Sequence, residues 1–237
     1  MPEAIKADAL IPMDIFPGEP FLIDIVYADK NHPHNIFGCA LYHESARLIL
    51  QRDMARIILL CARALRETHG WTLVLKDGLR PVEAQARMAE TNIVKENPHW
   101  LEGPRRMLSS PGVGAHPRGM AIDVSVIDRD NNPVDMGTVF DEMTEQSARD
   151  YTGFSALVLE NRRILQTAFT DSAAKLDLPM LPLPSEWWDF RFPSDYTRGF
   201  APLSDADLPD DLKICVKRVQ ADAGKDAALA KSVLLSL

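Results

Sequence analysis

The chain has 237 residues, of which 46% are hydrophobic and 25% are charged, so it is long enough for one large core or two small ones. Its formal net charge of −8 argues against nucleic acid or an anionic membrane as the main partner, because both favour a basic face. The first residues do not follow the pattern of a signal peptide, and no apolar run approaches the roughly 20 residues of a membrane helix. We therefore expect a cytoplasmic protein, with homo-oligomer formation left open.

The three cysteines do not form a recognisable framework. Cys39, Cys61 and Cys215 are far apart and odd in number, and Cys61 lies in an apolar helical run. This pattern argues against a disulfide scaffold and against a zinc site built from cysteine.

The N-terminal part of the chain predicts little regular structure. Residues 1–20 are spaced by prolines and indicate an extended arm, and residues 21–26 read as a first strand. A polar loop follows over 27–42, with His32 and His34, and loop histidines are far more often solvated than bound to metal.

The next segment has clear helical and strand patterns. Apolar residues recur over 44–69 with a spacing near 3.6, which predicts a helix, and Gly70 suits its C-cap. The mostly apolar run 71–75 predicts a strand. Pro81 is tolerated at the first position of a helix, so we expect a second helix from there to about residue 97.

The middle of the chain alternates loops with two further strands and a helix. Residues 97–114 are rich in proline and glycine and predict a loop, which leads to a strand over 122–127. A second loop is expected over 135–141 and a third helix over 154–174. Aromatic and alternating residues favour a strand over 187–192.

These elements predict an α+β fold with a small, mostly antiparallel sheet and flanking helices. We expect a single domain over residues 1–204, with the open face of its sheet free for a functional site. Residues 205–237 change in character and predict a helical C-terminal tail, with a short helix over 209–220. The tail would dock on the body or on another subunit.

His116 and Asp123 are the first candidates for chemistry. They lie seven positions apart, with small residues between them, so the histidine is expected in a turn and the aspartate on the strand that follows. Both side chains are good ligands for a borderline cation such as Zn²⁺. Two ligands do not complete a site.

Arg80 follows a predicted strand and precedes a proline-started helix, a position where loops often carry function. Its guanidinium suits a carboxylate or a developing oxyanion. Taken alone, a surface salt bridge is the better interpretation.

Glu186 and Asp189 are two carboxylates three positions apart, next to Trp187 and Trp188. On a strand these acids face opposite sides, so they share a site only if the strand twists, bulges or ends there. A glutamate in a tryptophan-lined pocket would have a raised pKa, as a general base requires. The alternative is two solvated acids with one buried and one exposed tryptophan.

Five short motifs occur in one order, and together they resemble a known family. They are D-G-x-R-P, H-x-x-G-x-A-x-D, M-G-T-x-F-D, N-R-R-x-L and E-W-W, from about Tyr27 to Phe192. Each is weak alone, but the ordered set is similar to the D-alanyl-D-alanine dipeptidases, zinc enzymes known from vancomycin resistance and related to zinc D,D-carboxypeptidases.

The resemblance implies a function for most of the candidates. His116 and Asp123 would bind zinc, Glu186 would be the general base, and Arg80 would stabilise the transition state. The M-G-T-x-F-D loop, which ends at Asp141, would lie near the amino end of the substrate. Trp187 is expected at the substrate site beside the glutamate.

The sequence departs from the family at two positions. The third zinc ligand of the family is a histidine in E-W-W-H, but this chain has Asp189 there and no histidine after His116. The family usually has serine two residues before the ligand histidine, where this chain has Gly114. Asp189 could be a ligand in a site that also admits Mn²⁺ or Co²⁺, the site could be lost, or the substrate could differ.

We expect metal-dependent hydrolysis of a small dipeptide such as D-Ala-D-Ala, with a metal site formed by His116, Asp123 and Asp189. The competing hypothesis is a catalytically impaired relative that binds a peptide or acts as a scaffold. A carboxypeptidase that trims longer peptidoglycan stems is a further alternative within the enzyme class.

Overall fold

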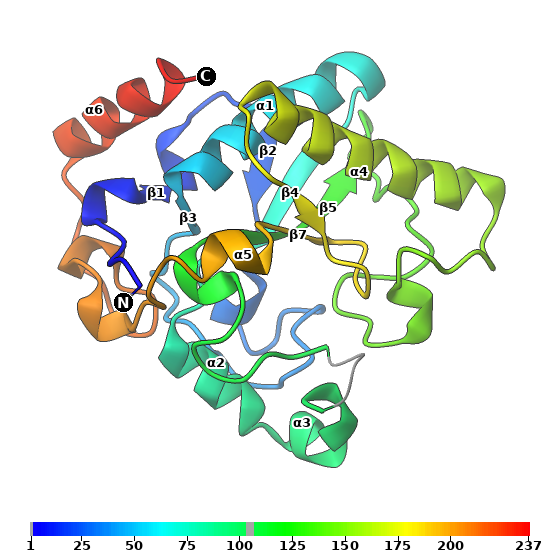
Figure 1. Cartoon of the computed structure of the whole chain (residues 1–237), viewed down its shortest axis with the longest axis horizontal. Coiled ribbons are helices and arrows are strands. Elements are labelled where there is room, and N and C mark those ends of the chain that lie inside the picture. Colours follow the sequence, from blue (N-terminus) through cyan, green and yellow to red (C-terminus); the bar gives the residue numbers. More distant parts are fainter. Residues whose placement is uncertain (1, 103–106) are drawn as a thin grey trace.

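A five-stranded sheet forms the centre of the protein in the computed structural model, which describes residues 2–102 and 107–237 (Figure 1). The strand order is β2-β4-β5-β7-β6, and all neighbours are antiparallel except the parallel pair β2 and β4. The bounds are Phe21–Ile23 for β2, Thr72–Asp77 for β4, Ala121–Ile127 for β5, Leu181–Pro182 for β6 and Asp189–Arg191 for β7. The expected α+β fold with a small, mostly antiparallel sheet is confirmed.

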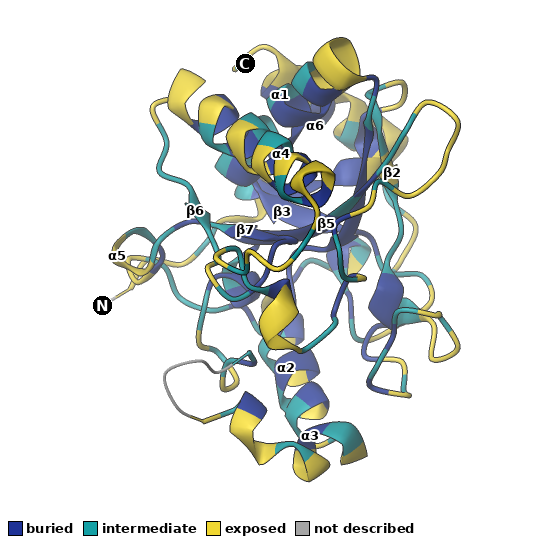
Figure 2. Cartoon of the chain, turned by 90° about the vertical axis from the view of Figure 1, so that its right-hand side faces the viewer, coloured by how far each residue is buried: buried dark blue, intermediate teal, exposed yellow. Residues whose placement is uncertain are grey.

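Two long helices cover one face of the sheet. Helix α1 (Arg52–His69) packs against β4 and against α4 (Ala156–Lys175), and both helices lie on the same side of the strands in two perpendicular views (Figures 1 and 2). The Gln51 side chain caps the start of α1, and Gly70, with a φ of 70°, caps its end. These helices leave the opposite face of the sheet for the site.

The predicted start of this helix, at residue 44, is wrong. Ile49–Gln51 is instead a short strand, β3, which pairs antiparallel with β1 (Leu10–Pro12). Both strands are buried, so their apolar residues are explained by burial and not by a helical face. The predicted arm over 1–20 therefore contains a strand, and the predicted strand over 21–26 is shorter because Val26–Ala28 forms a 3₁₀ turn.

The other face of the sheet carries short helices and loops. They include α2 (Val82–Ala89), α3 (Asn92–Glu96) and α5 (Ser194–Thr197). The predicted helix over 81–97 is interrupted at Glu90, where α2 ends. The predicted loop over 97–114 contains one 3₁₀ turn and includes residues 103–106, which lie outside the described residues.

The C-terminal segment folds back onto the chain. Helix α6 (Ala223–Leu234) lies near α1, and the Arg47 guanidinium donates to Asp226, with 2.8 Å between Nη2 and Oδ2. The predicted helix over 209–220 is only the 3₁₀ turn Asp210–Leu212. Among the described residues, no helix is both long and apolar enough to span a bilayer.

Gly119 is a point where the fold depends on a missing side chain. Its φ is 63°, and a Cβ there would lie 2.9 Å from the Gln51 backbone nitrogen, which donates to the Gly119 carbonyl at 2.7 Å. We expect Gly119→Ala to lower the free energy of unfolding by about 2–4 kcal/mol, through left-handed strain and overpacking. Urea unfolding measures this change.

Gly38 provides a matched control, because its φ is 66° and a Cβ there would meet nothing within 4 Å. Gly38→Ala should cost only the conformational strain, about 1–2 kcal/mol. Equal losses for the two variants would show that the close approach of Gly119 to Gln51 contributes nothing.

Candidate active site

Three aspartates form a row across three neighbouring strands. Asp77 of β4 is in register with Asp123 of β5, which is in register with Asp189 of β7. All three are buried, with at most 2% of each residue exposed. Because paired residues project from the same side of a sheet, the register brings three carboxylates together on the face that α1 and α4 leave free.

His116 lies above this row in a 3₁₀ turn, His116–Arg118, that ends at Gly119. Its Nδ1 is 2.8 Å from the Gly78 carbonyl oxygen, which can only accept, so Nδ1 is the donor. Its Nε2 lies 3.6 Å from Asp123 Oδ2 and 3.3 Å from Asp189 Oδ2. The Nε2 edge of this imidazole therefore faces Asp123 and Asp189.

The same two carboxylates determine how strongly His116 holds its second proton. Burial and the Arg80 charge lower the pKa of His116, but Asp123 and Asp189 outweigh them and raise it to about 10. A metal ion in contact with Nε2 would take the place of that proton.

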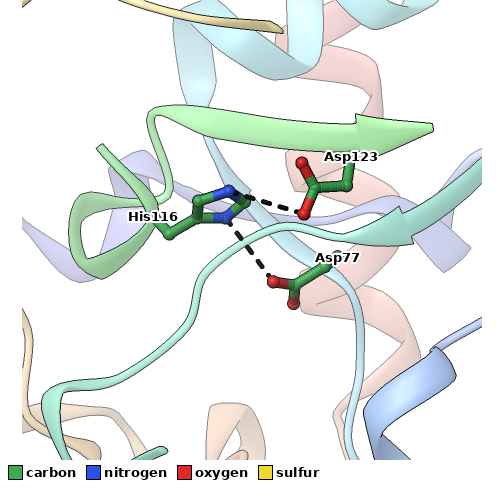
Figure 3. A group of neighbouring side chains, drawn as sticks. All are labelled: Asp77, His116 and Asp123. Atoms are coloured by element: carbon green, nitrogen blue, oxygen red, sulfur yellow. Dashed lines mark ion pairs between the residues drawn. The ribbon is translucent and has the colours of Figure 1, made fainter. Parts of the chain in front are cut away.

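Asp77 lies on the opposite side of the imidazole, 3.6 Å from Nδ1 (Figure 3). Both of its oxygens have partners: Tyr42 donates to Oδ1 at 2.5 Å, and Arg80 donates to Oδ2 through Nη2 at 2.6 Å. Asp77, His116 and Asp123 are close enough to hold a metal. The occupied oxygens of Asp77 indicate instead that it orients Arg80.

Arg80 is buried beside the row. Its Nη2 lies 3.5 Å from Asp123 Oδ2 in addition to its bonds with Asp77. Burial opposes the charge, but Asp77 and its acidic neighbours keep the pKa of Arg80 well above its usual value. The guanidinium is therefore a fixed positive charge next to the row.

Glu186 joins the site because β7 begins only at Asp189. The glutamate precedes the strand, so the two acids avoid the opposite-face arrangement of a continuous strand. Oxygens of Asp123, Glu186 and Asp189 lie within 4.8 Å of one another. Such a group of buried negative charges requires a proton or a cation.

Two oxygens of this group are without a partner. Asp123 Oδ1 and Glu186 Oε1 are buried and accept no hydrogen bond from the described residues. Burial, and then the Asp189 charge, raise the pKa of Glu186 well above its usual value, and burial raises that of Asp123 to about 6. The unpartnered oxygens mark a place that fits a divalent cation.

Asp189 differs from the other two because an arginine of the chain, Arg191, donates to both of its oxygens. Arg191 Nε donates to Asp189 Oδ1 at 2.7 Å, and Arg191 Nη2 donates to Oδ2. Burial raises the pKa of Asp189, but Arg191 and His116 outweigh this and hold it well below its usual range. Asp189 is therefore an ionised carboxylate that faces the His116 Nε2.

Asp141 contacts a residue from the β2 end of the strand order, whereas Arg191 lies on β7, on the other side of β5. Asp141 accepts a 2.5 Å hydrogen bond from the hydroxyl of Tyr27. Tyr27 follows β2, the edge strand that pairs with β4. Burial raises the pKa of Asp141 to about 7, although the Tyr27 hydrogen bond lowers it. Its backbone φ of 63° indicates a specifically built loop position.

A cavity of about 560 Å³ brings most of the predicted site residues together. Its lining includes Arg80, His116, Asp123, Asp141, Glu186 and Asp189. Trp187 is not part of that lining, since its indole nitrogen donates to Thr138 at 2.8 Å and both tryptophans are buried. The position of Trp187 does not support the prediction that it contacts substrate.

Several neighbours of the site were not among the sequence candidates. Asp77 had a signal, because it is the first residue of D-G-x-R-P, and Arg191 alternates with Asp189 on a predicted strand. Tyr27 and Tyr42 had none, since only the folded chain brings their loop to Asp141 and Asp77.

Comparisons with known proteins identify the family of the chain. The family described as D-ala-D-ala dipeptidase matches residues 15–204. A D-alanyl-D-alanine dipeptidase of Escherichia coli K12 is 30% identical over 171 residues, which cover 72% of this chain and 78% of the relative. One from Enterococcus faecium is 32% identical over 158 residues, 62% of this chain and 75% of the relative. The chain therefore belongs to the D-ala-D-ala dipeptidase family.

Proposed function

We propose that this protein is a metal-dependent dipeptidase that hydrolyses D-Ala-D-Ala or a closely similar small dipeptide. The observation that carries the proposal is the pair of unpartnered buried oxygens, on Asp123 and Glu186, beside the open Nε2 edge of His116. A buried cluster of this kind suits a cation and a reacting water better than it suits folding alone. The cytoplasm remains the compartment that the sequence predicts.

His116, Asp123 and Asp189 would hold the ion. One imidazole and two carboxylates suit zinc, and the extra oxygen ligand also suits manganese or cobalt. When bound, the ion supplies a Lewis acid that polarises the peptide carbonyl and lowers the pKa of the attacking water.

Glu186 is the proposed general base. Its raised pKa follows from burial and from the neighbouring Asp189, so this carboxylate holds a proton more strongly than a solvated glutamate does. The glutamate takes a proton from the water while the water oxygen forms a bond to the carbonyl carbon. It then passes this proton to the leaving nitrogen as the C–N bond breaks.

Arg80 and Asp141 would contact two different parts of the substrate, the reacting carbonyl and the amino end. Arg80 is fixed by Asp77 and close to Asp123, so its charge can stabilise the oxyanion that develops on the carbonyl. Asp141 is held by Tyr27 and would bind the ammonium group of the substrate.

The ion pair between Asp189 and Arg191 favours a second candidate function. If Arg191 satisfied Asp189 completely, only His116 and Asp123 would remain for a metal, and the chain would be a peptide-binding relative without catalysis. A peptidoglycan carboxypeptidase is less favoured, because the buried Asp141, held by Tyr27, suits the free ammonium group of a dipeptide.

The test is D-alanine release from D-Ala-D-Ala after chelator treatment and addition of zinc, manganese or cobalt. We expect turnover with at least one ion, little turnover without metal, and little release of L-alanine from L-Ala-L-Ala in a parallel assay. Binding of D-Ala-D-Ala without turnover under any of these ions would favour the non-catalytic alternative.

A further inference from the structure

Arg191 uses only part of its guanidinium to hold Asp189. Nε and Nη2 face the carboxylate, while Nη1 donates no hydrogen bond to any residue that the structure describes. The side chain is 16% exposed and lines the cavity. Because all five N–H groups of arginine are donors, the Nη1 group is available to a ligand in the cavity.

The space beside Nη1 is open because residue 114 has no side chain. A Cβ on Gly114 would lie 3.9 Å from Arg191 Nη1 and 3.3 Å from the Ser109 hydroxyl oxygen. The Gly114 φ of 91° also disfavours other residues. Two departures from the family pattern, Gly114 and Asp189, are therefore neighbours of the same arginine.

The two ends of the cavity differ in charge. Asp141 and Tyr27 lie towards β2 and β4 on one side of Asp123, and Arg191 lies on β7 on its other side. An unblocked dipeptide carries an ammonium group at one end and a carboxylate at the other. The anionic end of the cavity matches the ammonium group, and the Arg191 end matches the carboxylate.

We propose that Arg191, through Nη1 and with help from the Ser109 hydroxyl, binds the carboxylate of the residue that leaves. The inference rests on the proposed function, and it makes Arg191 a specificity-determining residue. It limits substrates to those that end one residue after the cleaved bond. The other edge of the guanidinium holds Asp189 towards His116 at the same time.

The test compares D-Ala-D-Ala with its C-terminal amide, which lacks the negative charge. We expect wild type to prefer the acid in kcat/KM by about 10- to 100-fold, the range of a charged hydrogen bond. Arg191→Met should remove most of this preference by raising KM for the acid. Arg163→Met removes an exposed arginine that does not line the cavity and should keep the preference.

A second variant leaves the ion pair intact. Ser109→Leu would fill the space beside Nη1 without removing either Asp189 or Arg191, and it should also lower the acid preference. Thermal unfolding of each variant checks that it is folded. The proposal is overturned if folded Arg191→Met and Ser109→Leu keep the wild-type preference, or lose activity equally on acid and amide.

Calorimetry with the Glu186→Gln variant separates this inference from the proposed function. Tighter binding of D-Ala-D-Ala than of its amide, lost on adding Arg191→Met, would support the carboxylate site even without any hydrolysis. Hydrolysis by wild type without such a preference would contradict the carboxylate site and leave the dipeptidase function standing.

Discussion

Glu186→Gln is expected to lower kcat/KM for D-Ala-D-Ala by about 10²- to 10⁴-fold, the usual contribution of a general base. Glutamine keeps the size of the side chain but cannot accept a proton. It also removes one negative charge from the group with Asp123 and Asp189, so the fold and the metal content should persist. The measurement is the initial rate of D-alanine release by the metal-loaded protein.

The same substitution at an exposed site is the control. Glu160 lies on α4, pairs with Arg163 and does not line the cavity, so Glu160→Gln should keep wild-type activity. Activity of Glu186→Gln within about threefold of wild type would eliminate Glu186 as the base.

His116→Ala is expected to remove both metal and activity. The imidazole is the only nitrogen ligand in the proposed set, and its loss leaves only the carboxylates of Asp123 and Asp189 to hold the ion. Removing a group that only orients a ligand lowers metal affinity by about 10- to 100-fold. Removing His116, a proposed ligand, should lower it further. Metal content by mass spectrometry and D-alanine release measure the two effects.

His69→Ala is the matched control, because His69 is an exposed residue at the end of α1 and should affect neither readout. Retention of stoichiometric metal by His116→Ala would move the metal site away from this histidine. Retained activity with lost metal would contradict metal dependence itself.

The sequence predicted which side chains lie together in the cavity better than it predicted the elements around them. His116, Asp123 and Glu186 belong to short local motifs, so their identity could be read from spacing and from the family resemblance. The row of aspartates could not be read in this way, because it depends on the register of β4, β5 and β7. Register is set by the whole sheet and by turns far from the motifs.

The burial of residues 48–50 explains why the first helix was predicted to begin too early. Leu48 to Leu50 has the apolar character of the helix that follows, so the periodicity extended α1 backwards by about two turns. The structure pairs this segment with Leu10–Pro12, a contact between distant parts of the chain that no local pattern reveals. Continuous apolar runs fit a buried strand and a buried helix equally well.

Asp189 illustrates what only geometry could add. As a substitution for histidine it allowed a ligand, a broken site or an altered substrate. The structure adds that Arg191 contacts both of its oxygens and that Gly114 leaves space next to the arginine. A carboxylate ligand makes the ion a weaker Lewis acid than a second imidazole would, so metal preference is the property most open to change.

Elemental analysis of the protein purified without chelator tests the central claim most directly. We expect about one divalent ion per chain, held by His116 Nε2, Asp123 and Asp189 and lost in His116→Ala. A metal-free protein whose melting temperature does not change when zinc, manganese or cobalt is added would contradict it, since an ion that binds the native state must stabilise it.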